Sequence, residues 1–113
     1  MIKTSPLSGI YRNHPVNIIE VSGWHIAGNF GDIEREQDNL KKGAVIVDWS
    51  HIGKISLSQG NASAAAEKVL KGSSKIEPLN SMADSKIAVL RLTINDYLIL
   101  CQPNMEKNVL EKI

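Results

Sequence analysis

The hydrophobic pattern changes several times in the first half of the chain, and each change predicts an element boundary. Residues 1–15 are punctuated by proline and glycine and predict an irregular lead-in. Residues 16–21 are rich in β-branched side chains and predict a strand, whereas the mixed residues 24–30 predict a loop. A polar helix is expected from Asp32 to about Lys42, because acidic residues open it and lysines close it. The continuous apolar run 44–47 predicts a buried strand.

Residues 55–85 predict a strand, then a helix and then a loop. Ile55 and Leu57 alternate with serines, which predicts a half-buried strand. A helix with a face of small residues is expected from Asn61, as its N-cap, to about Lys71, with Gly72 closing it. Residues 73–85 predict a loop.

Two apolar runs near the C-terminus, 87–92 and 97–101, predict a hairpin. They flank a short turn at Asn95 and Asp96, and both should be central strands because both of their faces are apolar. A last helix opens at Pro103 and Asn104, with four residues expected to face inward: Met105, Val109, Leu110 and Ile113.

These elements together predict an α+β fold with the order β-α-β-β-α-β-β-α. The sheet should be mixed and mainly antiparallel, with the helices packed on it. A chain of 113 residues is expected to form one domain, residues 1–113, with a core of its own.

Charge and cysteine content remove several classes of function. Thirteen basic and twelve acidic residues give a net charge of +1, and aromatic residues make up 4%, so neither nucleic acid nor an anionic membrane is an expected partner. Cys101 is the single cysteine, so no internal disulfide can form. The N-terminus lacks the apolar run of a signal peptide and no apolar run is long enough to span a membrane, which predicts a cytoplasmic protein.

The densest cluster of chemically capable side chains is Asp48, Ser50 and His51. A Ser/His/Asp triad needs convergence in space, which neighbours in sequence seldom achieve, so a turn in which Asp48 and Ser50 satisfy backbone groups is the preferred interpretation. The three histidines are too widely spaced for a zinc site, and no metal site is predicted. On these grounds no catalytic residue is assigned.

The stretch 20–70 resembles the signature of the glycine-cleavage T-protein, a member of the folate-binding aminomethyltransferase superfamily. That signature contains Gly-Trp, an aromatic residue, a helix with glutamate and basic residues, and then Asp-x-Ser-His-x-Gly. The matching residues here are Gly23, Trp24, Phe30, Glu36, Lys41, Lys42, Asp48, Ser50, His51, Gly53 and Lys54. The chain thus looks like a truncated N-terminal part of that fold.

The second half departs from the T-protein pattern. The family's aspartate pair, which is central to aminomethyl transfer, is represented by Asp84 one position early and then by Ser85 and Lys86. The segments 77–81 and 90–100 instead look like the gamma subunit of heterotetrameric sarcosine oxidase, a relative of the T-protein. The resemblance therefore implies a chain without catalytic activity of its own.

The resemblance also implies a ligand site and a partner. In the family, the positions of Ile52, Tyr97 and Ile99 border a folate pocket, so these residues are candidate contacts to tetrahydrofolate. A structural role is the preferred interpretation of each, as core residues for Ile52 and Ile99 and as a strand aromatic for Tyr97. Trp24 is expected to be a core residue that packs against its own loop, a role called a core plug below. The implied function is a non-catalytic subunit that binds the large subunit of an amine-oxidising complex. Two alternatives are a stand-alone folate-binding module and, last, an aminomethyltransferase.

Overall fold

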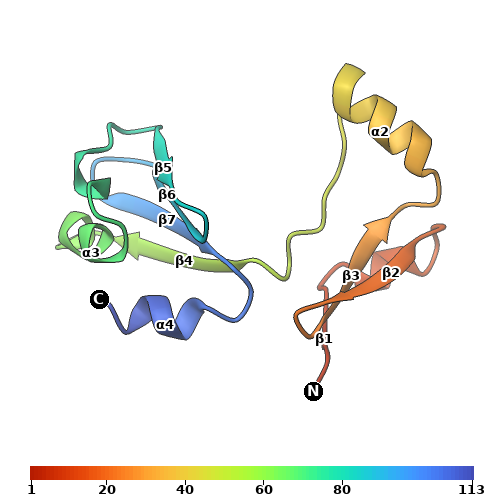
Figure 1. Cartoon of the computed structure of the whole chain (residues 1–113), viewed down its shortest axis with the longest axis horizontal. Helices are drawn as coiled ribbons and strands as arrows, with labels where there is room; N and C mark the ends of the chain where they lie inside the picture. The colour runs from red at the N-terminus through yellow and green to blue at the C-terminus, as the bar shows by residue number, and fades with distance from the viewer. The chain divides into compact units, whose positions relative to one another are not determined.

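The computed structural model describes all residues 1–113, and they form two compact units, Met1–His51 and Ile52–Ile113 (Figure 1). The two units are described separately below. Together they contain four helices and two mostly antiparallel sheets, which confirms the predicted α+β class. The single-domain assignment stays a prediction.

The N-terminal unit is built on a three-stranded sheet in the order β1-β3-β2, formed by β1 (Lys3–Thr4), β3 (Trp24–Asn29) and β2 (Asn17–Val21). Strand β1 pairs parallel to β3, and β2 pairs antiparallel to it. The short helix α1 (Ser8–Tyr11) lies between β1 and β2 in the sequence, so the lead-in predicted to be irregular contains a strand and a helical turn.

The loop predicted at residues 24–30 is wrong, because this segment is β3, the central strand of the unit. Ser22 and Gly23 both have positive φ angles, 50° and 81°. A two-residue connection with positive φ matches the twist of a β-hairpin, so it folds β3 back onto β2. The Ser-Gly dipeptide was therefore a hairpin signal as well as a strand end.

The polar helix is confirmed as α2 (Ile33–Lys42). Asp32 Oδ1 accepts a hydrogen bond from the backbone N–H of Arg35 at 3.0 Å, and Glu36 accepts one from the backbone N–H of Phe30 at 2.9 Å. These two carboxylates satisfy N–H groups at and just before the start of the helix. No residue of α2 is buried, as its thin apolar stripe predicts.

The buried strand predicted at residues 44–47 is wrong. The segment pairs with no strand, and its side chains are exposed, Ile46 to 80%. An apolar run predicts burial only where another element covers it, and within the N-terminal unit none does.

The C-terminal unit is a four-stranded antiparallel sheet in the order β4-β7-β6-β5. Its strands are β4 (Gly53–Ser58), β5 (Ser81–Ala83), β6 (Ile87–Arg91) and β7 (Asp96–Cys101). The predicted apolar hairpin is confirmed as β6 and β7, and both strands are central. Strand β5 and the short 3-10 helix η1 (Ser73–Lys75) occupy part of the segment that was predicted to be a loop.

Helices α3 (Ala62–Val69) and α4 (Glu106–Leu110) pack on this sheet (Figure 1). Ala66 and Val109 join Val89 and Ile99 in one core of buried side chains. Small residues on α3 permit this close approach, as predicted.

Two details of these helices differ from the sequence predictions. Asn61 stands at the N-cap of α3 but its side chain caps no backbone group. Helix α4 ends at Leu110, and the side chains of Leu110 and Ile113 are exposed instead of facing inward, whereas Val109 is buried. None of the four helices is both long enough and apolar enough to cross a lipid bilayer.

Candidate functional site

The side chain of Asp48 is the centre of a buried polar cluster in the N-terminal unit. Its Oδ1 accepts hydrogen bonds from the Ser50 hydroxyl at 2.6 Å and from the Ser50 backbone N–H at 3.0 Å. Its Oδ2 accepts one from the hydroxyl of Tyr11 at 2.6 Å. Ser5 completes the cluster, with its Oγ 3.1 Å from Ser50 Oγ. The cluster therefore ties α1 and the chain before it to the segment that follows α2.

The electrostatics of this cluster favour the ionised carboxylate. Burial alone would raise the pKa of Asp48, but hydrogen bonds from Ser50, Tyr11 and Ser5 outweigh it and hold that pKa well below its usual range. The pKa of Tyr11 is raised, first by burial and then by its hydrogen bond to the carboxylate. Asp48 is thus a fixed anion whose proton-accepting oxygens are already occupied.

This geometry confirms the turn interpretation for Asp48, which accepts a backbone N–H, whereas the Ser50 hydroxyl bonds side chains only. The Ser50 hydroxyl donates to Asp48 rather than to His51, so the three residues do not form a nucleophile and base pair. His51 is half-buried, and its Nδ1 is buried without a hydrogen-bond partner. No group of three or more His, Cys, Asp or Glu side chains is assembled that could hold a metal ion.

Sequence reasoning missed Tyr11 and Ser5. Both lie in the lead-in that was predicted to be irregular, and Tyr11 is 37 positions from the carboxylate that it contacts. A buried tyrosine usually finds a partner for its hydroxyl, but nothing in the sequence indicates which one. Their role follows only from the fold of the N-terminal unit.

The motif residues Gly23 and Trp24 serve the β2–β3 hairpin. Gly23 provides a positive φ in the turn. Trp24 begins β3 and is half-buried, with the Lys3 ammonium 5.3 Å from its ring centre. It is not among the buried residues of the unit, so the expectation of a core plug is wrong in detail.

Gly53, the last residue of the motif, is a packing residue at the start of β4. A Cβ atom there would overlap Cys101 Sγ of the paired strand β7 and would lie 2.9 Å from Cδ of Glu106 on α4. Only glycine therefore lets α4 lie so close to the sheet. Burial, and secondly the charge of Glu106, raise the pKa of the Cys101 thiol, which keeps it an unreactive core group.

The three candidate folate contacts lie in the C-terminal unit, but in different surroundings. Ile99 and Tyr97 are fully enclosed in the core on β7, which confirms the interpretation of Ile99 as a core residue and of Tyr97 as a strand aromatic. The Tyr97 hydroxyl has no hydrogen-bond partner. Ile52 precedes β4 and is partly buried, so it is not a fully enclosed core residue as expected, and it alone of the three has accessible surface. A contact between these residues and folate stays a prediction.

A second feature of the N-terminal unit is a set of apolar side chains in contact with water, which we call the exposed apolar surface: Ile33, Leu40, Val45, Ile46 and Val47. They line a groove of about 590 Å³ that runs between the end of β3, helix α2 and residues 44–48. The backbone of residues 44–47 makes no hydrogen bond to other backbone groups of the chain. This segment thus combines β-branched side chains with unpaired backbone groups.

Replacing Asp48 with asparagine should remove part of the acid sensitivity of the N-terminal unit. Because the pKa of Asp48 is lowered by folding, its ionised form stabilises the unit above about pH 4, and this contribution is lost as the pH falls below that value toward the folded pKa. Asp48→Asn should flatten the dependence of unfolding free energy on pH below pH 4 and cost about 1–3 kcal/mol at neutral pH.

Urea unfolding followed by tryptophan fluorescence measures this directly, because both tryptophans, Trp24 and Trp49, belong to the N-terminal unit. The matched control is Asp38→Asn on the exposed face of α2, which should leave both stability and its pH dependence unchanged. Equal behaviour of the two variants would show that the cluster does not stabilise the unit.

Comparison with known proteins finds aminomethyltransferases. The chain is 25% identical over 100 residues to the aminomethyltransferase of Bacillus velezensis, a match that covers 88% of this chain and 27% of that protein. It is 26% identical over 101 residues to the enzyme of Geobacillus kaustophilus, covering 89% of this chain and 24% of the relative. A probable aminomethyltransferase of Halobacterium salinarum is 28% identical over 78 residues, or 68% of this chain and 22% of the relative.

The chain therefore spans about a quarter of the length of the curated relatives that it matches. No protein-family model matches it. The relatives from Bacillus, Geobacillus and Halobacterium are all aminomethyltransferases or probable aminomethyltransferases.

Proposed function

Because this chain belongs to the folate-binding aminomethyltransferase superfamily, we propose that it is a non-catalytic subunit that assembles with a larger polypeptide. The complex we propose is an amine-oxidising one of the sarcosine oxidase type, with a flavin-containing large subunit. The single observation that carries the assembly is the exposed apolar surface on the N-terminal unit.

The hydrophobic effect makes this surface costly in a free monomer. Ile46, Val47 and Leu40 expose 80%, 62% and 70% of their area, and burying such side chains is worth about 1.5–3 kcal/mol each. Contiguous apolar patches of this kind mark sites that another polypeptide covers. The side chains thus supply a driving force for association.

The backbone of the same segment supplies a mode of association. Residues 44–47 are β-branched or small, and their N–H and C=O groups are not paired with those of another strand. A partner can satisfy these groups by adding a strand along the segment, with its apolar side chains entering the groove beside α2. We therefore place the proposed docking site at residues 44–47.

The kind of complex rests on the resemblance of residues 77–81 and 90–100 to the oxidase gamma subunit. In the structure residues 77–80 lead into β5, which begins at Ser81, and residues 90–100 run from the end of β6 through the turn into β7. The two segments are joined by backbone hydrogen bonds between Arg91 and residues 79 and 80. The position of the family's aspartate pair is a tight turn in which Asp84 accepts hydrogen bonds from the backbone N–H groups of Lys86 and Ile87, at 2.7 and 2.8 Å. A carboxylate engaged in this way serves the turn, which supports a non-catalytic role.

Tetrahydrofolate is the cofactor that superfamily membership suggests, and Ile52 is the candidate contact with accessible surface. We propose folate binding only as a secondary property of the subunit, because Tyr97 and Ile99 are enclosed in the core.

Isolation of the tagged chain at native expression level from its own source tests the proposal. We expect it to elute with a larger subunit that carries flavin absorbance, at a constant ratio across the peak. Elution of the chain alone as a clean monomer would contradict the proposed function.

A further inference from the structure

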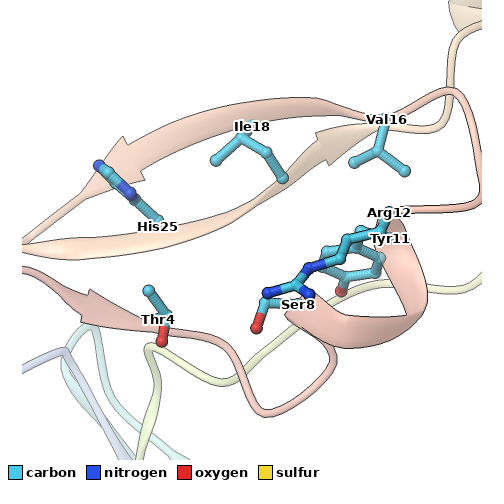
Figure 2. Close-up of a pocket in the computed structure, with 7 residues that line it drawn as sticks. All are labelled: Thr4, Ser8, Tyr11, Arg12, Val16, Ile18 and His25. Carbon is cyan, nitrogen blue, oxygen red and sulfur yellow. The ribbon is translucent and has the colours of Figure 1, made fainter.

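A pocket in the N-terminal unit, separate from the Asp48 hydrogen bonds and from the exposed apolar surface, lies between α1 and one face of the three-stranded sheet (Figure 2). Its volume is about 280 Å³. Side chains from every element around it contribute to the lining: Thr4, Ser8, Tyr11, Arg12, Val16, Ile18 and His25. We propose that this pocket binds a small carboxylate with an apolar body.

The walls of the pocket favour a ligand with an apolar body. Val16 and Ile18 present their methyl groups to the pocket in Figure 2, and the ring of Tyr11 faces them from α1. Ile18 is half-exposed, so part of this apolar wall is open to a ligand. A purely polar ion such as free phosphate would leave these groups uncovered, whereas an aromatic or branched body would cover them.

The Tyr11 wall is held in place from two directions. Its hydroxyl donates to Asp48 at 2.6 Å, and its ring makes an edge contact with Phe30, the ring centres being 5.9 Å apart at 71°. A side chain fixed in this way needs no reordering when a ligand arrives, which reduces the entropic cost of binding. The pocket is therefore preformed on that side.

The charge of the ligand follows from Arg12. Its guanidinium lies at the pocket with no carboxylate paired to it, and Figure 2 shows it extending toward Ser8. A guanidinium offers a planar pair of donors that fits one carboxylate in two parallel hydrogen bonds. A monoanion is favoured over a dianion because Glu20 Oε2 stands 4.0 Å from Nε2 of His25, at the other end of the pocket.

Titration of the full chain with benzoate, followed by amide and methyl NMR, tests the proposal. We expect saturable shifts at Arg12, Ile18 and Tyr11 with a dissociation constant on the order of millimolar, as suits a small ligand in an open pocket. Benzyl alcohol, a neutral compound of similar shape, should bind at least about tenfold more weakly, because it cannot form the paired charged hydrogen bonds.

Two variants distinguish benzoate binding in this pocket from nonspecific attraction of anions to the protein. Arg12→Gln should weaken benzoate binding at least about tenfold, whereas the same change at Arg35, exposed on α2, should leave it unaltered. In the absence of benzoate, the amide chemical shifts of β2 and β3 in each variant should match those of the parent chain, which would show that the unit stays folded. Equal binding of benzyl alcohol, equal binding by Arg12→Gln, or shifts spread over the surface lysines would each overturn the proposal.

Discussion

Replacement of Ile99 by alanine is expected to lower the free energy of unfolding of the C-terminal unit by about 2–5 kcal/mol. Ile99 is fully enclosed and lies in register between Ile55 of β4 and Val89 of β6, at the centre of the four-stranded sheet. The substitution removes apolar atoms and leaves a cavity that the paired strands cannot close. Amide hydrogen exchange of β6 and β7 under native conditions measures the loss in the unit concerned.

The size of the residue, rather than its identity, should set this cost. Ile99→Val should lose only about 0.5–1.5 kcal/mol, because it deletes a single methylene group. Ile94→Ala, in the exposed turn between β6 and β7, is the matched control and should stay within about 0.5 kcal/mol of the parent. A loss at Ile99→Ala no larger than at Ile94→Ala would contradict the assigned core.

Replacement of Gly53 by alanine is expected to destabilise the same unit by about 1–3 kcal/mol through overpacking. The added Cβ would overlap Cys101 Sγ and press on the Glu106 side chain, so either β4 or α4 must shift. Thermal unfolding by circular dichroism would record the change. Gly9→Ala is the control, because a Cβ at Gly9 meets no atom within 4 Å.

A double substitution identifies the atom responsible. In a Cys101→Ala background the sulfur is absent, so Gly53→Ala should cost at least about 0.5 kcal/mol less than it does in the parent chain. Strict additivity of the two substitutions would show that contact with the sulfur is not the reason for glycine at this position of the motif.

The sequence pattern predicted the elements whose partners lie nearby in the chain. Helix α2 carries its own start and end signals, and the β6–β7 hairpin joins two apolar runs through a short turn. Both follow from local rules for helix ends and hairpins. The predicted turn at Asp48 and Ser50 is also local, since its hydrogen bonds join residues two positions apart.

Features that depend on distant partners escaped prediction. Tyr11 meets Asp48 across 37 positions, and no local rule relates them. The apolar run 44–47 is predicted to be buried from its hydrophobicity, yet its side chains are exposed. Hydrophobicity indicates that a segment tends to be buried, but it does not identify the element that would bury it. Gly53 matched a motif in the sequence, but the reason for glycine appears only when β7 and α4 pack against it.

The proposed subunit role is tested most directly by isolating the chain and its Ile46→Asp variant side by side from the native source and measuring the flavin absorbance that elutes with each. The parent chain should recover a flavin-containing large subunit, and the variant should recover at least about tenfold less, because an aspartate at residue 46 places a charge in the proposed interface. Ile94→Asp, in the C-terminal unit, should behave like the parent, and unchanged tryptophan fluorescence should show that the Ile46→Asp variant is folded. Equal recovery by the parent and the Ile46→Asp variant, or a parent chain that elutes alone, would contradict the account.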